Sequence, residues 1–178
     1  RVRRRDAGPG AHHRFDPLTY IVRHRLCDWI VKEWNQLDVA CNNAGVNNWV
    51  DSVDLSETDW NWIYDTNVKG AFFSTQAEGR VMIAAGSGSI INLASMSARV
   101  TNRPQMQAHY NSSKAALVQL TKSLAADWAS SRVRVNSLSP GYTRPAMADA
   151  PRPRHGPPLW TPYGPEERRS GTEWRARG

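Results

Sequence analysis

The chain has 178 residues, 40% of them hydrophobic, which is enough for one globular domain with a buried core. Its net charge of +7 comes from the ends, because residues 1–26 hold seven arginines and two acidic residues, and residues 151–178 hold six and three. Residues 27–150 carry a net charge of −1 and therefore lack the basic face of a nucleic-acid-binding protein.

The first predicted elements are a tail, a helix and a strand. Residues 1–19 are rich in Arg, Gly and His without any period, and we expect an irregular tail there. Apolar residues recur at helical spacing over residues 20–34. The apolar run at residues 37–41 is typical of a buried strand, and the turn-forming letters NNAG follow it.

The middle of the chain predicts two more helices and two more strands. Ser56, with Asp59 three residues later, is a candidate N-cap for a long helix over residues 56–83. Residues 88–95 and 132–138 read as buried strands, and between them a helix starts at His109. That helix carries an apolar stripe made of Leu117, Leu120, Leu124 and Trp128.

Alternating strands and helices of this length indicate parallel βαβ units. Residues 149–178 are rich in Pro and Arg and show no periodic element. We therefore expect one α/β core over residues 20–148, followed by an irregular tail.

Tyr110 stands four residues before Lys114 at the start of the last predicted helix. Side chains four apart project from the same helix face, and a cation close to a phenol favours the phenolate. Such a tyrosine can give a proton to a carbonyl oxygen or take one from an alcohol. By itself the pair is a common one, and two solvated side chains are the alternative.

Small or polar residues follow all three predicted strands. These are residues 42–45 (NNAG), Ser95, and residues 139–143 (SPGYT). Because parallel strands end at the same edge of a sheet, the three groups are expected to border one ligand crevice. A serine hydroxyl there can hydrogen-bond the oxygen of a substrate.

Five motifs together resemble the short-chain dehydrogenases/reductases over residues 20–148. They occur in the family's order and spacing: LDVACNNAG, DTNVKGAFF, GSIINLASMS, HYNSSKAAL and VRVNSLSPGYTR. The finer pattern is most similar to members that act on sugars and polyols, such as sorbose reductases and mannitol or arabinitol dehydrogenases. The resemblance implies an NAD(P)-dependent enzyme that interconverts a secondary alcohol and a carbonyl compound by hydride transfer.

The resemblance also assigns a catalytic centre. Tyr110 is implied as the acid/base, and Lys114 as the residue that favours its phenolate and binds the nicotinamide ribose. Ser95 would polarise the carbonyl. Ser97, thirteen residues before Tyr110, fits the family's commonest spacing, but Ser95 follows INLA at the strand end where the family places its serine. Asn67 matches an asparagine whose helix kink holds a water in the proton relay, and a polar residue merely tolerated on a helix is its alternative.

The implied cofactor is NAD or NADP, without a metal, and the motifs do not distinguish the two. Tyr110 and Lys114 would contact it, and so would residues from the loops after the first and third strands. On the adenosine side these are Asn42, Ala44 and Gly45, and on the nicotinamide side Pro140, Gly141 and Thr143.

The chain lacks the glycine-rich turn that is typical of the family. The family opens with a strand and a T-G-x-x-x-G-x-G turn that holds the pyrophosphate. Here GPG at residues 8–10 follows no predicted strand, and GSGS at residues 86–89 precedes one. We therefore expect a Rossmann-like three-layer α/β fold with a parallel sheet, truncated at both ends, without the first βαβ units and the last strand. Its cofactor binding is expected to be weak or lost. The alternative function is an inactive remnant that keeps a helical association surface.

The family also suggests partners. The resemblance implies a homodimer or homotetramer through residues 56–83 and 107–130, with Trp62, Phe72 and Trp128 as anchors, and packing within the chain is an equal alternative for Trp128.

The remaining signals concern location. Cys27 and Cys41 form no C-x-x-C pair, and no apolar run approaches the ~18 residues of a membrane span. We expect a cytoplasmic protein that binds a small-molecule substrate, and neither a membrane nor nucleic acid.

Overall fold

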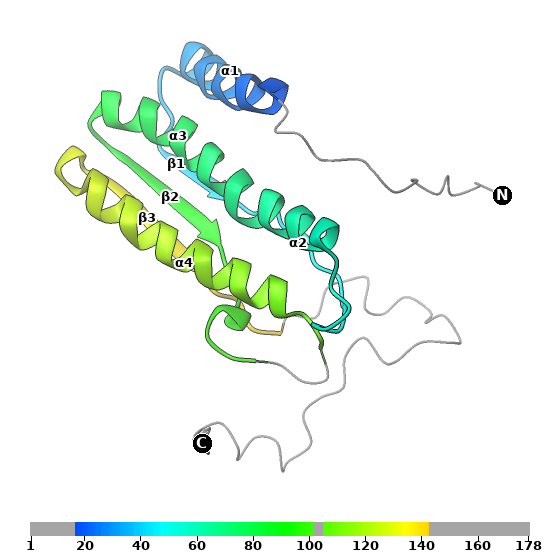
Figure 1. Ribbon diagram of the computed structural model, residues 1–178. Coiled ribbons are helices and arrows are strands. Elements are labelled where there is room, and N and C mark those ends of the chain that lie inside the picture. The colour runs from blue at the N-terminus through cyan, green and yellow to red at the C-terminus, as the bar shows by residue number, and fades with distance from the viewer. Residues whose placement is uncertain (1–16, 102–104, 143–178) are drawn as a thin grey trace, which may run out of the picture. The chain divides into compact units, whose positions relative to one another are not determined.

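The computed structural model describes residues 17–101 and 105–142 (Figure 1). These residues form three parallel strands and the helices that connect them. The elements are α1 (Pro17–Trp34), β1 (Val39–Asn42), α2 (Glu57–Tyr64), the π-helix η1 (Asp65–Gly70), α3 (Ala71–Ala85), β2 (Gly88–Leu93), the 3₁₀ helix η2 (Met96–Ala98), α4 (Ala108–Trp128), the 3₁₀ helix η3 (Ala129–Ser131) and β3 (Val133–Leu138). The predicted alternation of strands and helices is confirmed. The tail predicted over residues 149–178 lies outside the described residues.

The sheet has the order β1-β2-β3, and β2 pairs in parallel with both neighbours. Val39 lies opposite Ser89 in the first pair, and Gly88 lies opposite Val133 in the second. Parallel neighbours need a crossover connection, which α2, η1 and α3 supply before β2 and α4 supplies before β3. All three strands therefore end at the same edge of the sheet.

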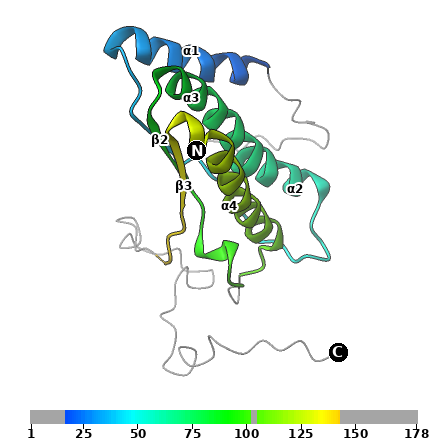
Figure 2. The same cartoon turned by 90° about the vertical axis from the view of Figure 1, so that its left-hand side faces the viewer.

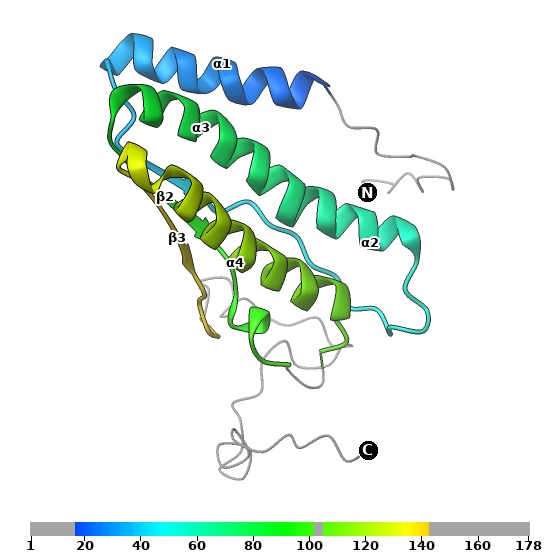
Figure 3. The same ribbon diagram turned by 60° about the vertical axis from the view of Figure 1, so that its left-hand side comes forward.

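The helices cover one face of this sheet. Helices α3 and α4 lie against the strands, and Figure 2 shows both on the same side of β2 and β3. Helix α1 lies beside α3 (Figure 3). On the other face, side chains of β1 and β3 are exposed, among them Val39 and Leu138. Of the three layers expected for a Rossmann-like fold, the described residues therefore supply the sheet and one helical layer.

The core lies between the sheet and helices α3 and α4. Its buried side chains are Met82, Ile90, Leu124, Val133 and Val135. Trp128 packs against this cluster, and a Cβ atom built at Gly79 would lie 2.5 Å from its indole ring. Trp128 therefore belongs to packing within the chain, where it lets α4 approach α3 closely over a glycine.

The helix ends show which local predictions were right. The Ser56 hydroxyl caps α2 by accepting a hydrogen bond from the Asp59 amide, as the sequence predicts. The tail predicted over residues 1–19 was wrong at its last three positions, because α1 begins at Pro17, and proline is well tolerated in the first turn of a helix. Gly86 ends α3 in the left-handed conformation with φ 71°, which other residues adopt at a cost.

The long helix predicted over residues 56–83 is not continuous. Its middle is the π-helix η1, which separates α2 from α3. The wider turn of a π-helix often occurs at functional sites. Residue 67, one of the predicted catalytic positions, lies inside η1 and is fully buried.

A polar network crosses the otherwise apolar core. Asn92 on β2 accepts a hydrogen bond from Asn42 on β1 at 3.0 Å and from Thr75 on α3 at 3.1 Å, and it donates one to Thr121 on α4 at 3.1 Å. Asn42 Nδ2 also lies 2.9 Å from Glu78 Oε2. Because a buried amide must find partners, this network ties two helices to two strands.

Both cysteines are free thiols. Burial of Cys27 in α1, together with the charges of Glu78 and Asp28, raises the pKa of its thiol to about 11. Among the described helices, none has the length and apolar character needed to cross a membrane.

The half-buried carboxyl group of Glu78 makes folding stability depend on pH. Burial raises its pKa above the ordinary value, and the hydrogen bond from Asn42 offsets only part of that rise. A folded-state pKa above the unfolded one means that stability is highest below the unfolded value and falls as pH rises through the folded value. We expect Glu78→Gln, which keeps an acceptor for Asn42, to raise the Tm at pH 8 and to leave it nearly unchanged at pH 4.

Thermal unfolding followed by circular dichroism between pH 4 and 8 measures this difference. The control is Glu33→Gln, which removes an equal charge from an exposed position on α1. A Glu78→Gln protein less stable than the parent at pH 8 would contradict the assignment.

Candidate active site

The candidate site forms where the carboxyl ends of the strands meet. The segments that follow β2 and β3 stay paired beyond the strands, because Ala94 N donates to Leu138 O at 2.8 Å and Met96 N donates to Pro140 O at 2.9 Å. The first turn of α4 borders the same edge. The prediction that the three polar strand ends share one edge of the sheet is confirmed.

Tyr110 and Lys114 lie one turn apart near the start of α4. The Lys114 ammonium lies 5.7 Å from the centroid of the Tyr110 ring, within cation–π range. Its Nζ donates to Leu93 O at the end of β2, at 2.7 Å. The side chain is 4% exposed, and this burial lowers the pKa of Lys114 below the ordinary lysine value. Leu93 O is its one described hydrogen-bond acceptor, so two of its three N–H groups are available to a ligand.

Gly45 brings two other predicted residues together. A Cβ atom at Gly45 would lie 3.3 Å from Lys114 Nζ and 3.4 Å from Asn67 Oδ1. A Cβ atom there would make tight contacts with both polar groups, and glycine avoids them. The loop after β1, the π-helix and α4 thus meet at one point.

Asn67 holds the loop after β1 with both ends of its amide. Val46 N donates to Asn67 Oδ1 at 2.8 Å, and Asn67 Nδ2 donates to Val46 O at 2.9 Å. The same Nδ2 donates to Ser113 Oγ on α4 at 3.2 Å. The buried side chain therefore fixes the Gly45–Val46 segment relative to the helix that carries Tyr110 and Lys114.

The two serines after β2 lie in different surroundings. Ser95 is half-buried at the N-cap of η2, and its Oγ accepts a hydrogen bond from Ser97 N at 3.1 Å. Ser97 is buried, and its Oγ accepts a long contact of 3.4 Å from Gln107 Nε2. In the described part of the chain the Ser95 hydroxyl hydrogen has no acceptor, which leaves it free to donate.

The predicted cofactor residues lie in loops at the same edge, with one exception. Ala44 and Gly45 are exposed after β1, and Pro140 and Gly141 follow β3. The Asn42 side chain, in contrast, bonds to α3 and β2 inside the core. Thr143 lies outside the described residues.

Gln107 is a buried site residue that the sequence did not reveal. Its Oε1 accepts a hydrogen bond from Asn47 Nδ2 at 2.8 Å, and its Nε2 donates to Asn111 Oδ1 at 3.0 Å and contacts Ser97. One amide thus links the loops after β1 and β2 to the first turn of α4. No periodicity or motif distinguishes such a glutamine in a loop.

Comparison with known proteins agrees with these features. The family model for short chain dehydrogenases matches residues 16–155. The chain is 42% identical over 149 residues to a galactitol 2-dehydrogenase of Rhizobium johnstonii, covering 79% of this chain and 58% of that protein. It is 39% identical over 147 residues to a sorbose reductase of Candida albicans, covering 80% and 52%. The chain spans about half the length of the curated relatives it matches.

Solved structures show the same fold. A xylitol dehydrogenase bound to NAD⁺ matches with a TM-score of 0.67 at 33% identity, covering 72% of this chain and 49% of that one. A gluconate 5-dehydrogenase from Burkholderia cenocepacia, in complex with NADP and tartrate, matches with a TM-score of 0.67 at 30% identity, covering 74% and 51%. Relatives of this chain therefore bind either NAD or NADP, and several act on polyols. From its fold, its motifs and these matches, the chain belongs to the short-chain dehydrogenase/reductase family.

Proposed function

We propose that the site carries out NAD(P)-dependent interconversion of a secondary alcohol and a carbonyl compound, with Tyr110, Lys114, Ser95 and Asn67 as its catalytic centre. The observation that carries the proposal is the meeting of Gly45, Asn67 and Lys114 beside Tyr110. A cation beside a phenol is the pairing that acid/base chemistry on a hydroxyl requires. The polyol relatives favour a polyol or sugar as the alcohol.

Each side chain has a distinct role in this proposal. When bound, the nicotinamide supplies or accepts the hydride. Tyr110 gives a proton to the carbonyl oxygen during reduction and takes it from the hydroxyl during oxidation. Lys114 stabilises the phenolate through its charge and binds the nicotinamide ribose with its available N–H groups. Asn67 keeps Gly45 and the Lys114 side chain in place and supports a water in the proton relay.

Ser95 is the better of the two candidates for polarising the substrate oxygen. It is half-buried at the end of β2, and its hydroxyl hydrogen is free among the described residues. Ser97 is buried and contacts Gln107. The buried Ser97 hydroxyl would have to give up its contact with Gln107 before it could bind a substrate. The Ser95 hydroxyl can donate to a substrate without losing a hydrogen bond.

The described residues fit only one half of a dinucleotide cofactor. The Lys114 ammonium, which lies close to Gly45, can hydrogen-bond the hydroxyl groups of a ribose. The half-buried Pro140 and the exposed Gly141 offer backbone groups that the nicotinamide can contact. The pyrophosphate needs backbone N–H groups at a helix that opens directly after a glycine-rich turn. In the described ranges α2, α3 and α4 open without such a turn.

An inactive protein that keeps only its helical surface is the second candidate function. It is favoured by that incomplete cofactor site. The cytoplasmic location expected from the sequence stays a prediction.

Substitution of Tyr110 tests the catalytic assignment. Tyr110→Phe keeps the ring over the lysine and removes the acidic hydroxyl, so any dehydrogenase activity should fall by about 10²–10⁴-fold, the contribution typical of a general acid/base. The measurement is NAD(P)H formation with galactitol, sorbitol and xylitol at saturating cofactor. A fully active Tyr110→Phe protein would rule out the assignment.

The two serines give a matched pair of variants within the same experiment. Ser95→Ala should lower activity by roughly 10²-fold or more, whereas Ser97→Ala should cost less than about tenfold. The opposite ranking would assign the polarising role to Ser97.

Cofactor affinity tests the missing half of the site. Each charge-assisted bond to a phosphate contributes roughly 1.5–3 kcal/mol, so loss of three such bonds weakens binding about a thousandfold or more. We expect NAD and NADP to bind with a Kd in the millimolar range or weaker. Calorimetric titration measures it, with nicotinamide mononucleotide as the control, which should bind within about tenfold of NAD because both use the same contacts. A low micromolar Kd for NAD or NADP would reveal a phosphate site elsewhere in the chain.

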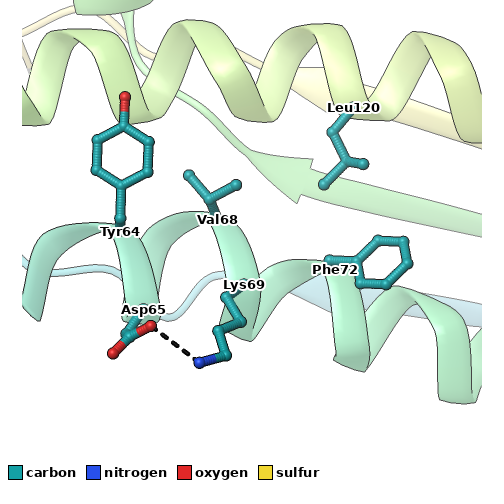
Figure 4. A pocket seen from close by; sticks show the side chains of 6 residues that line it. All are labelled: Tyr64, Asp65, Val68, Lys69, Phe72 and Leu120. Atoms are coloured by element: carbon teal, nitrogen blue, oxygen red, sulfur yellow. Dashed lines mark hydrogen bonds and ion pairs between the residues drawn. The ribbon is translucent and has the colours of Figure 1, made fainter. Parts of the chain in front are cut away.

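We further propose that the chain self-associates through helices α2–α3 and α4. A shallow apolar hollow lies between them, lined by Tyr64, Val68, Phe72 and Leu120, with an Asp65–Lys69 ion pair at its margin (Figure 4). Trp60 stacks on Tyr64 beside it and is 40% exposed. An isologous dimer would bury both copies of this surface around a two-fold axis.

A charge in the hollow should separate the dimer. Leu120→Lys places an ammonium group on the α4 side of the hollow and should weaken dimerisation about thirtyfold, the effect of a typical hot-spot residue. Gln119→Lys, exposed one position earlier on α4, is the control and should leave it unchanged. Sedimentation velocity across a concentration series measures both, and a parent chain that stays monomeric at high concentration would refute the interface.

A further inference from the structure

A chain of three short hydrogen bonds ends on the residue before Tyr110. The Ser56 hydroxyl donates to Asp59 Oδ2 at 2.5 Å, Asn48 Nδ2 donates to Asp59 Oδ1 at 2.8 Å, and His109 Nε2 lies 2.6 Å from Asn48 Oδ1. Helix α2, the loop after β1 and the first turn of α4 each contribute to it. Ser56, Asp59 and Asn48 lie outside the motifs that indicated the family, and His109 is the first residue of HYNSSKAAL.

The chemistry of this chain determines the state of the imidazole. The Asp59 carboxylate only accepts, so the Asn48 amide must direct its NH₂ group to Asp59 and its oxygen to His109. An oxygen accepts, so His109 Nε2 must carry the hydrogen. Nδ1 is then the unprotonated nitrogen of the neutral ring.

That Nδ1 atom has no hydrogen-bond partner in the described part of the chain, and the His109 side chain is fully buried. A second proton can bind only at Nδ1, where it would create a buried cation without an acceptor for its new N–H group. Such a cation is costly. Burial accordingly lowers the pKa of His109, and the negative charge of Asp59 on α2 offsets part of that effect.

Among the described residues, Asp59 on α2 is the charged group that acts on the ring, and the loop after β1 contributes the neutral Asn48. Along α4 the residues on either side of His109 are the uncharged Ala108 and Tyr110. Protonation is therefore accommodated best when the ring leaves its buried position. Because Tyr110 is the next residue, that movement unwinds the turn which carries it.

We propose that His109 is a positioning residue, held in its Nε2–H tautomer by Asn48 and Asp59, and that protonation of its bare Nδ1 releases the Tyr110 end of α4. That Tyr110 is the group being positioned for catalysis rests on the proposed function. The tautomer and the release do not, because neither requires cofactor or turnover.

Histidine nitrogen shifts measured by NMR on the full chain test the tautomer. In protein labelled with ¹⁵N-histidine at pH 8, we expect the His109 signals of a neutral ring protonated at Nε2, identified by their absence from His109→Gln. A ring protonated at Nδ1 at that pH would overturn the proposal.

Hydrogen exchange across a pH series tests the release. In the parent chain, protection factors at residues 46–50 and 108–113, corrected for intrinsic exchange, should fall about tenfold per pH unit once His109 begins to protonate. His109→Gln keeps an N–H donor for Asn48 but cannot be protonated, and its protection factors should stay flat. Glu57→Gln removes a charge from the same turn of α2 without touching the chain of hydrogen bonds, and should behave like the parent.

Two outcomes would overturn the release. One is a parent chain whose protection does not fall between pH 8 and 5, and the other is a His109→Gln protein whose protection falls equally. If His109→Gln does not fold, Asn48→Ala replaces it, and this variant should show low protection in both segments at every pH. Failure of dehydrogenase activity leaves all of these readouts intact, so it is distinguishable from failure of this proposal.

Discussion

The parallel pairing of β2 with both of its neighbours is the constraint on which the rest of the structure depends. A parallel pair cannot be closed by a tight turn, so each connection contains a helix, and α3 and α4 both lie on the same face of the sheet. The same pairing places the ends of all three strands at one edge. Three loops that are far apart in sequence therefore start at the same edge of the sheet, and together they form the candidate site.

Buried amides then convert that edge into a defined geometry. Asn92 joins the strands to α3 and α4, and Asn67 joins the loop after β1 to α4. Gln107 joins the loops after β1 and β2 to the first turn of α4. An unsatisfied buried polar group costs about 1–3 kcal/mol, so each of these side chains has few acceptable positions. Apolar packing alone would hold the helices against the sheet without specifying the position of the Lys114 ammonium.

In the proposed function, the substrate half and the phosphate half of a dinucleotide site depend on different elements. The residues proposed to act on the substrate oxygen lie at β2, η1 and α4, which are all described, and hydrogen bonds connect α4 to both β2 and η1. The phosphate half depends on a glycine-rich turn at a helix start, which the described residues do not contain. Among the described residues, helices cover one face of the sheet and none covers the other, and the chain matches about half the length of its curated relatives.

The local pattern of the sequence was sufficient to predict the class of fold and the edge of the sheet at which the candidate site lies. Apolar runs and helical periodicity predicted the three strands and the helices between them, and the spacing of Tyr110 and Lys114 placed both on one helix face. Only the tertiary structure decided that α2 and α3 are separated by a π-helix, that Trp128 packs on Gly79, and that Asn42 points into the core. The roles of Gln107 and His109 also emerged only from the tertiary structure. Their hydrogen bonds join residues some sixty positions apart, and such bonds produce no periodic pattern in a sequence.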